Sequence, residues 1–87
     1  MPRFIAEHTL PHSEVEFLEM AKTTAPQIPE GFTWKLTYCD FDSHKFICEW
    51  DAPSKEALDQ AFKANQMPYD VIYAVKLYNV ADATMND

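Results

Sequence analysis

Hydrophobic and polar residues alternate through two neighbouring segments in the middle of the chain, residues 32–39 and 45–51. A period of two is typical of a strand whose two faces lie in different environments. The two segments therefore predict a β-hairpin in which the even-numbered positions form an apolar face. That face consists of Phe32, Trp34, Leu36, Tyr38, Phe46, Cys48 and Trp50.

The even-numbered face restricts how the two strands of the hairpin can pair. Residues opposite each other share a face, so Tyr38 needs an even-numbered partner, and pairing with Ile47 would mix the two faces. We therefore expect a turn with a loop of odd length or a bulge. The turn has no glycine, so we expect Asp42, Ser43 or His44 to adopt a left-handed conformation.

Patterns on either side of the hairpin predict two helices and two more strands. Residues 3–9 and 70–80 contain the short apolar stretches of strands. Ser13 and Ser54 are suitable N-caps, and apolar residues recur at helical spacing after each of them. The predicted order is therefore strand, helix, strand, strand, helix, strand.

This βαββαβ order is the ferredoxin-like arrangement of two split β-α-β units. Right-handed crossovers place both helices on one face of an antiparallel four-stranded sheet, which makes the fold class α+β. We expect a single domain at residues 1–80 and a loose C-terminal tail at residues 81–87. The other face of the sheet would stay bare, which favours a homodimer formed through that face.

Composition narrows the classes of partner. The chain has 7 basic and 14 acidic residues and a net charge of −7, which disfavours binding to nucleic acid and to anionic membrane surfaces. The opening Met1-Pro2-Arg3 leads directly into a predicted strand, and no segment is long enough to span a bilayer.

Cys39 and Cys48 would point to opposite faces of the sheet, which prevents a disulfide. We therefore predict a soluble cytoplasmic protein with free thiols.

The polar face of the predicted sheet carries the side chains that could bind a ligand. Glu7 and Glu49 belong to strands that are neighbours in the ferredoxin-like order. The two carboxylates could form a proton-transfer pair, or Lys35 and Lys76 could neutralise them in a salt-bridged interface. The candidate ligand-binding residues are Glu7, Lys35, Cys39, Glu49, Lys76 and Tyr78.

The histidines are the candidate metal ligands, and there are three of them: His8, His12 and His44. Imidazole binds nickel, copper and zinc, and thiolate or carboxylate can complete such a site. The spacing of the three histidines matches none of the strong metal-binding motifs, so ordinary surface histidines are the alternative.

Three stretches of the chain carry a resemblance to known proteins: MPRFIAEHTLP, GFTWKLTYC with KFICEWDAPSKEAL, and QMPYDVIYAVKLYNV. They resemble a family of small bacterial nickel-binding proteins and domains of unknown function with a ferredoxin-like fold. The residues that match the family's pattern are Glu7, Trp34, Tyr38, Cys48, Trp50, Asp51, Ala52, Pro53 and Ser54. The family more often has Glu where Asp51 stands. The resemblance implies a dimer formed through the sheet and, in some members, nickel binding.

Two classes of function are left by this reasoning. The first is a homodimeric binding protein that holds Ni(II) or a small ligand on or beside the open sheet face. The second is a cofactor-free dimeric α/β-barrel enzyme, with Glu7 and Glu49 as acid and base and Lys76 or Tyr78 as polarising groups. The chain has no glycine-rich loop, and we expect no organic cofactor. The resemblance favours the binding protein.

Overall fold

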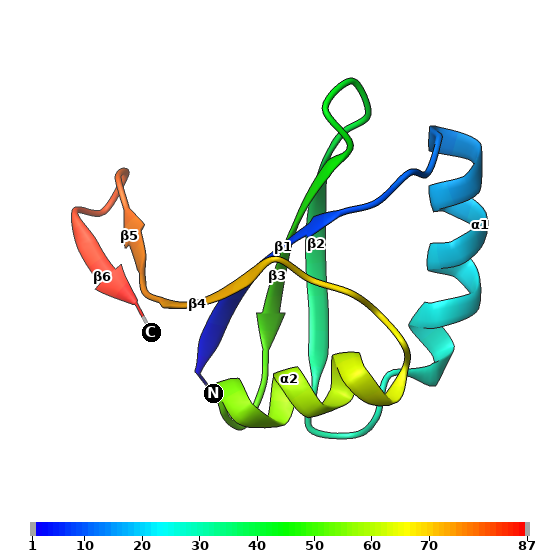
Figure 1. Cartoon of the computed structure of the whole chain (residues 1–87). Coiled ribbons are helices and arrows are strands. Elements are labelled where there is room, and N and C mark those ends of the chain that lie inside the picture. The colour runs from blue at the N-terminus through cyan, green and yellow to red at the C-terminus, as the bar shows by residue number, and fades with distance from the viewer. Residues whose placement is uncertain (1, 87) are drawn as a thin grey trace.

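Four antiparallel strands form the centre of the molecule, in the order β2-β3-β1-β4, as seen in Figure 1. The structure is a computed structural model that describes residues 2–86. The elements are β1 (Arg3–Thr9), α1 (Glu14–Thr24), the 3-10 turn η1 (Ala25–Gln27), β2 (Thr33–Asp40), β3 (Lys45–Asp51), α2 (Lys55–Ala64), β4 (Val71–Val75), β5 (Leu77–Asn79) and β6 (Thr84–Asn86). Their order and pairing confirm the predicted ferredoxin-like α+β fold class.

Both helices begin where the sequence predicts, because a serine caps each of them. The Ser13 side chain accepts a hydrogen bond from the Glu16 backbone N–H at 3.3 Å, and the Glu16 carboxylate accepts from the Ser13 N–H at 2.8 Å. At α2, the Ser54 hydroxyl accepts from the Ala57 N–H at 3.0 Å. These bonds satisfy backbone donors that the first helical turn leaves without partners.

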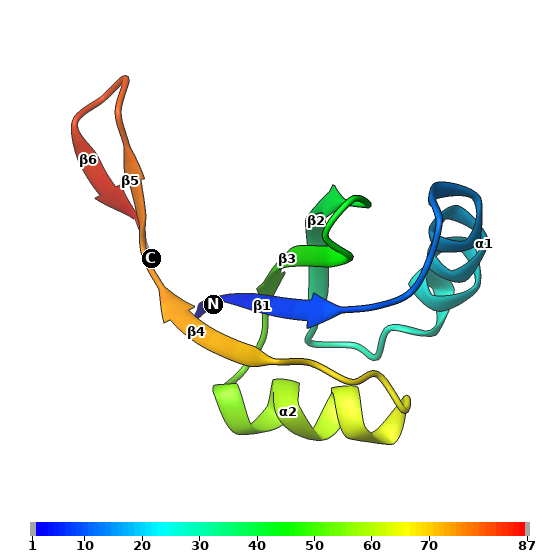
Figure 2. The ribbon, with the colours of Figure 1, turned by 45° about the horizontal axis from the view of Figure 1, so that its top comes forward.

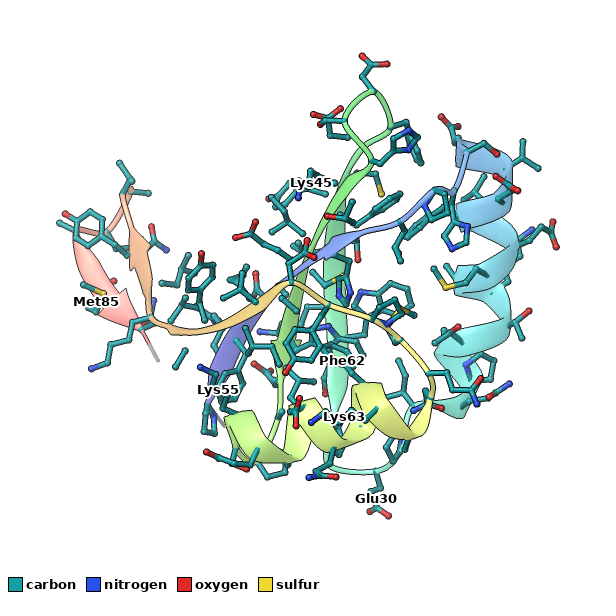
Figure 3. All side chains as sticks on the ribbon, viewed as in Figure 1. Glu30, Lys45, Lys55, Phe62, Lys63 and Met85 are labelled. Carbon is teal, nitrogen blue, oxygen red and sulfur yellow. The ribbon has the colours of Figure 1, made fainter. Side chains whose placement is uncertain are left out.

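The helix α2 packs closely on one face of the sheet, which we call the covered face. Leu58 and Phe62 are the buried residues of this helix, and Phe62 points from α2 toward the sheet in Figure 3. Figure 2 shows α2 lying alongside β4 and β1. The side chains that the sheet and its following loop bury in this core are Phe4, Ala6, Cys48, Trp50, Ala52 and Ile72.

The helix α1 stands farther from the sheet than α2 does, as Figures 1 and 2 show. None of its residues is buried. Phe17 connects it to the covered face, because its ring stacks on Phe46 with a centroid distance of 5.2 Å. Leu18, on the same helix, is 49% exposed. The packing between α1 and the sheet is therefore loose.

The pairing of β2 with β3 differs from our expectation. Trp34 faces Trp50 as the alternation requires, but the register shifts between Trp34 and Leu36, and Tyr38 pairs with Ile47. A bulge at Lys35 therefore moves Leu36 and Tyr38 to the face opposite the helices, which we call the open face. The predicted apolar face was wrong for these two residues.

The turn between β2 and β3 explains this register. It has four residues, 41–44, so the predicted odd loop was wrong, and the bulge lies in the strand. The Asp40 carboxylate accepts hydrogen bonds from the Ser43 hydroxyl at 2.6 Å and from two backbone N–H groups. His44 has a φ of 58°, which confirms that a residue of this turn adopts the left-handed conformation.

The C-terminal residues form a hairpin that projects from the rest of the molecule (Figures 1 and 2). β4 ends at Val75, and β5 pairs with β6 in a separate two-stranded sheet. We expected one strand over residues 70–80 and a loose tail over 81–87; within the described part of that range, residues 84–86 are instead a strand. Residue 87 lies outside the described residues. The domain boundary at residue 80 stays a prediction.

Candidate functional site

The open face carries a group of apolar side chains that no helix covers. Tyr38 is 68% exposed and Tyr73 is 48% exposed, and Leu36 and Ile47 are also exposed. The pairing places Tyr73 opposite Ile5 in the neighbouring strand β1, so apolar residues lie on all four strands of this face, with Glu7 and Glu49 between them. Large exposed apolar side chains gathered on one face are typical of a surface that binds a partner or a ligand.

Four charged side chains lie beside this apolar group and pair with one another. Arg3 Nε lies 3.2 Å from Glu49 Oε2, and Lys35 Nζ lies 3.7 Å from the same oxygen and 3.4 Å from Asp51 Oδ2. The approach of Arg3 to Glu49 brings the charges close without hydrogen-bond geometry, and Arg3 Nε and Nη1 are buried without a hydrogen bond among the described residues. We call Arg3, Lys35, Glu49 and Asp51 the charged cluster.

The structure places the two predicted carboxylates on the same face but not side by side. Glu7 pairs with Ile47, and Glu49 pairs with Ile5, so the two glutamates are diagonal neighbours. Glu49 is held by Arg3 and by Lys35. The salt-bridged alternative therefore describes Glu49, with Arg3 in addition to the predicted Lys35.

Three other predicted ligand residues lie away from the open face. Cys39 pairs with Phe46 and faces the helices, so its placement on the open face was wrong. Lys76 lies between β4 and β5, and Tyr78 pairs with Met85 in the projecting hairpin. Of the six predicted ligand residues, the four-stranded sheet thus brings Glu7, Lys35 and Glu49 to one face.

Cys39 and Cys48 share the covered face, contrary to the prediction that they point in opposite directions. Both are free thiols. Burial raises the pKa of each thiol, the Glu14 carboxylate raises that of Cys39 further, and a hydrogen bond from the Thr37 hydroxyl to Cys48 Sγ at 3.1 Å partly opposes the rise at Cys48. Two thiols held protonated in this way are poor nucleophiles.

The histidines predicted as metal ligands lie in different environments. His8 is 3% exposed, and its Nδ1–H donates to the carbonyl oxygen of Pro68 at 2.7 Å. Burial lowers the pKa of His8, although the Pro68 carbonyl and the Asp70 carboxylate oppose that shift. The ring is therefore a neutral imidazole whose second nitrogen, Nε2, carries the free lone pair.

His12 and His44 belong to one end of the molecule. The Leu10 N–H donates to the His44 carbonyl oxygen at 3.1 Å, and His12 follows Leu10 by two residues. His44 is exposed and His12 is half-buried. Within residues 2–86, no group of three or more His, Cys, Asp or Glu side chains is arranged to hold a metal ion. The roles of the three histidines stay predictions.

A second polar group joins β1, β3 and the start of β4. The Thr9 hydroxyl donates to Asp70 Oδ2 at 2.6 Å, and the Lys45 ammonium donates to Thr9 Oγ1 at 2.7 Å. The Thr9 hydrogen bond, followed by the nearby Lys45 charge, lowers the pKa of Asp70. These exposed contacts hold the ends of three segments together.

Sequence reasoning missed Arg3 as a member of the charged cluster. Arg3 and Glu7 are both odd-numbered positions of β1, and β1 pairs with β3 so that Arg3 lies opposite Asp51. The alternation of side chains along β1 would therefore have placed Arg3 on the same face as Glu7. Its contact with Glu49 depends in addition on the register between β1 and β3.

The fold and this face define a class of protein: a ferredoxin-like α+β domain whose antiparallel sheet has helices on one face and an apolar and charged surface on the other. The chain belongs to the SCO4226-like family of nickel responsive proteins, whose family model matches residues 4–75. The sequence-based recognition of a nickel-related bacterial family is thereby confirmed. The β5–β6 hairpin lies beyond the matched residues.

The solved structures include a match to this fold, the crystal structure of SCO4226 from Streptomyces coelicolor A3(2). The two proteins are 20% identical, the TM-score is 0.73, and the match covers 88% of this chain and 99% of that chain. No curated protein matches the sequence. In the described part of the chain, neither helix is long and apolar enough to cross a membrane.

Proposed function

We propose that this protein binds Ni(II) as a homodimer formed through the open face of its sheet. The observation that carries the proposal is the open face, where Tyr38 and Tyr73 are exposed next to the charged cluster. The choice of nickel as the metal rests on the description of the family, which is nickel responsive. Membership in the family and the surface of the sheet thus support different parts of the proposal.

A second copy of the chain suits the open face better than a charged partner does. The charged cluster holds two cations and two anions, so the cluster itself is neutral although the whole chain has a net charge of −7 and Glu7 adds one more carboxylate to the open face. Two copies can therefore bring their charged clusters together without net repulsion. Facing sheets would exclude water from the tyrosines and from the ion pairs, and a two-fold axis would place the same surface on both sides of the interface.

Histidines at the end of the molecule near the β2–β3 turn are the donors that we assign to nickel. His12 and His44 have imidazole rings that solvent reaches, and imidazole nitrogen is a suitable ligand for Ni(II). His8 is a poorer candidate, because it is buried and one of its ring nitrogens already donates to Pro68. Water or a second copy would supply the other ligands.

The enzyme alternative finds less support in the geometry. It requires Glu7 and Glu49 to act as acid and base, but Glu49 is engaged by Arg3 and Lys35. The binding protein is therefore the function that the arrangement of residues favours.

Calorimetry of Ni(II) binding tests the nickel part of this proposal. Chelator-stripped protein without a histidine tag should take up Ni(II) with a defined stoichiometry. A double variant, His12→Ala with His44→Ala, should lose most of the uptake, and the matched variant His8→Asn should retain it. Wild-type protein that takes up no nickel would contradict the function, and a double variant that binds as tightly as wild type would contradict the assigned donors.

A further inference from the structure

The β5–β6 hairpin, residues 77–86, has little of its surface packed against the rest of the chain. Every residue in it except Asn79 is exposed, and Figures 1 and 2 show the hairpin projecting from the sheet and the helices. Each of its strands has three residues. A single two-stranded hairpin is at best marginally stable in water, so this one requires a further surface to hold it in place.

The loop of the hairpin makes this requirement stronger. Ala83 has a φ of 55°, a left-handed conformation that the Cβ atom of alanine makes unfavourable. The Asn79 side chain accepts a hydrogen bond from the Asp82 N–H at 3.3 Å. That bond is exposed to water, which competes for both groups, so it adds little stability. Contacts with a second surface would supply the stability that the loop and the short strands do not.

One face of the hairpin is apolar. Tyr78 lies opposite Met85 in the pairing of β5 with β6, and the two side chains are 53% and 61% exposed. We call these two residues the apolar face of the hairpin. Thr84, next to Met85 in β6, lies on the other face, where it pairs with Asn79. Large exposed apolar side chains on one side of a projecting segment are typical of a binding surface.

The position of the hairpin indicates which molecule it meets. In Figure 2 it rises on the side of the sheet away from α2, which is the side of the open face. It follows the end of β4, where Val75 pairs with Arg3 of the charged cluster. The hairpin therefore begins at the margin of the surface where the second copy is proposed to bind. Its one charged residue within 77–86 is Asp82, so it brings little charge to another acidic chain.

We propose that the β5–β6 hairpin packs its apolar face on a second copy of the chain, at the margin of the open-face interface. This inference rests on the proposed homodimer, and it adds a contact made by residues beyond the 4–75 that the family model matches. Under two-fold symmetry each copy contributes one hairpin and receives one. The contact removes Tyr78 and Met85 from water and stabilises the folded conformation of the hairpin.

Methionine methyl groups test the proposal in the wild-type protein. Met85 lies on the hairpin, labelled in Figure 3, whereas Met67 packs against the core beneath the covered face. Mixed dimers of one copy with ¹³C-labelled methionine methyls and one unlabelled copy give an isotope-filtered NOE spectrum that records only contacts between copies. The Met85 methyl should show such contacts, and the Met67 methyl should show none. Met85→Leu and Met67→Leu assign the two signals.

Two charged variants measure how much the hairpin contributes to the dimer. Met85→Asp places a charge in the proposed contact and should raise the dissociation constant about tenfold. Thr84→Asp places the same charge on the other face of β6 and should change the constant by less than about twofold. Sedimentation equilibrium at falling protein concentration compares both variants with wild type.

The outcomes separate this proposal from the proposed function. A wild-type dimer in which the Met85 methyl makes no contact with the other copy overturns the role of the hairpin and leaves the proposed function standing. A wild-type protein that is monomeric at every concentration overturns both. Equal weakening by Met85→Asp and Thr84→Asp would contradict the assigned face. The wild-type NOE spectrum decides the question even if a variant hairpin does not fold.

Discussion

The two faces of the sheet differ in how they treat apolar and polar side chains. The covered face buries Phe4, Ala6 and Ile72 under α2 but leaves the Trp50 N–H without a hydrogen bond. The open face pairs its charges and leaves large apolar side chains such as Tyr38 in water. The covered face therefore buries its apolar side chains but not all of its polar groups are hydrogen-bonded, whereas the open face pairs its charges but exposes apolar side chains. On the open face, association with a second surface would remove these exposed apolar side chains from water.

The difference also shows what an alternating pattern can and cannot tell. Alternation says which residues share a face, but it does not say what covers that face. Leu36 and Tyr38 look like core residues by sequence, and the bulge at Lys35 turns them toward the open face. Apolar residues on an uncovered face are then a signal of association.

The largest expected effect concerns the covered face, where α2 and α1 contribute unequally. Leu58 is fully buried and Leu18 is 49% exposed, so the same substitution can be made on both helices. Leu58→Ala should lower the free energy of unfolding by about 2–5 kcal/mol, and Leu18→Ala should lower it by less than about 1 kcal/mol. Urea unfolding at one protein concentration measures both. Equal losses would contradict the loose packing of α1.

The second prediction concerns the open face as the dimer surface. Ile47→Asp should place a charge in the middle of the buried interface and weaken the dimer at least tenfold, because an unpaired charge is costly to bury. Leu18→Asp adds the same charge on α1, outside the proposed interface, and should leave the dimer intact. Light scattering on a sizing column at falling protein concentration compares the two variants. If Leu18→Asp dissociates the dimer and Ile47→Asp does not, the interface lies on α1.

A smaller effect concerns the buried histidine at the edge of the covered face. The pKa of His8 is lowered in the folded protein, chiefly by burial, so the unfolded chain binds a proton more readily than the folded chain does. Stability is therefore fully present above the unfolded value of about 6.5 and falls as the pH drops through the lower folded pKa. Carboxylates whose pKa is lowered, such as Asp70, act in the same direction at more acidic pH.

Two matched variants show how much of the pH dependence of stability belongs to His8. His8→Asn keeps a donor for the Pro68 carbonyl and cannot titrate, so thermal unfolding between about pH 7 and 5 should depend less on pH than in wild type. His44→Asn is a suitable control, since asparagine tolerates the positive φ of that position. It makes the same substitution at an exposed histidine, so it shows how much of any change seen in His8→Asn comes from the substitution itself. Parallel curves for all three proteins would show that burial does not lower the pKa of His8.

The parts of the fold that could be predicted from sequence are those that local chemistry determines. Ser13 and Ser54 cap their helices because a serine oxygen can accept from the first-turn N–H groups. The left-handed residue of the hairpin turn falls on His44, within the predicted set. The order of elements then leaves few possible topologies, and the ferredoxin-like one is observed.

The parts that could not be predicted depend on how distant segments meet. The bulge at Lys35 carries no glycine signal, and one shifted residue moved Cys39 to the covered face. The contact of Arg3 with Glu49 requires the register between β1 and β3. The β5–β6 hairpin follows from the break at Lys76, where strand alternation alone predicts continuation.

The central claim is that two chains meet through the open face, and sedimentation equilibrium of the wild-type protein beside Ile47→Asp tests it most directly. The chain has a mass of 10.1 kDa. The account predicts a wild-type particle of twice this mass, with and without Ni(II), and a smaller mean mass for Ile47→Asp at the same concentrations. A particle with the mass of one chain at every concentration, whether or not Ni(II) is present, would contradict it.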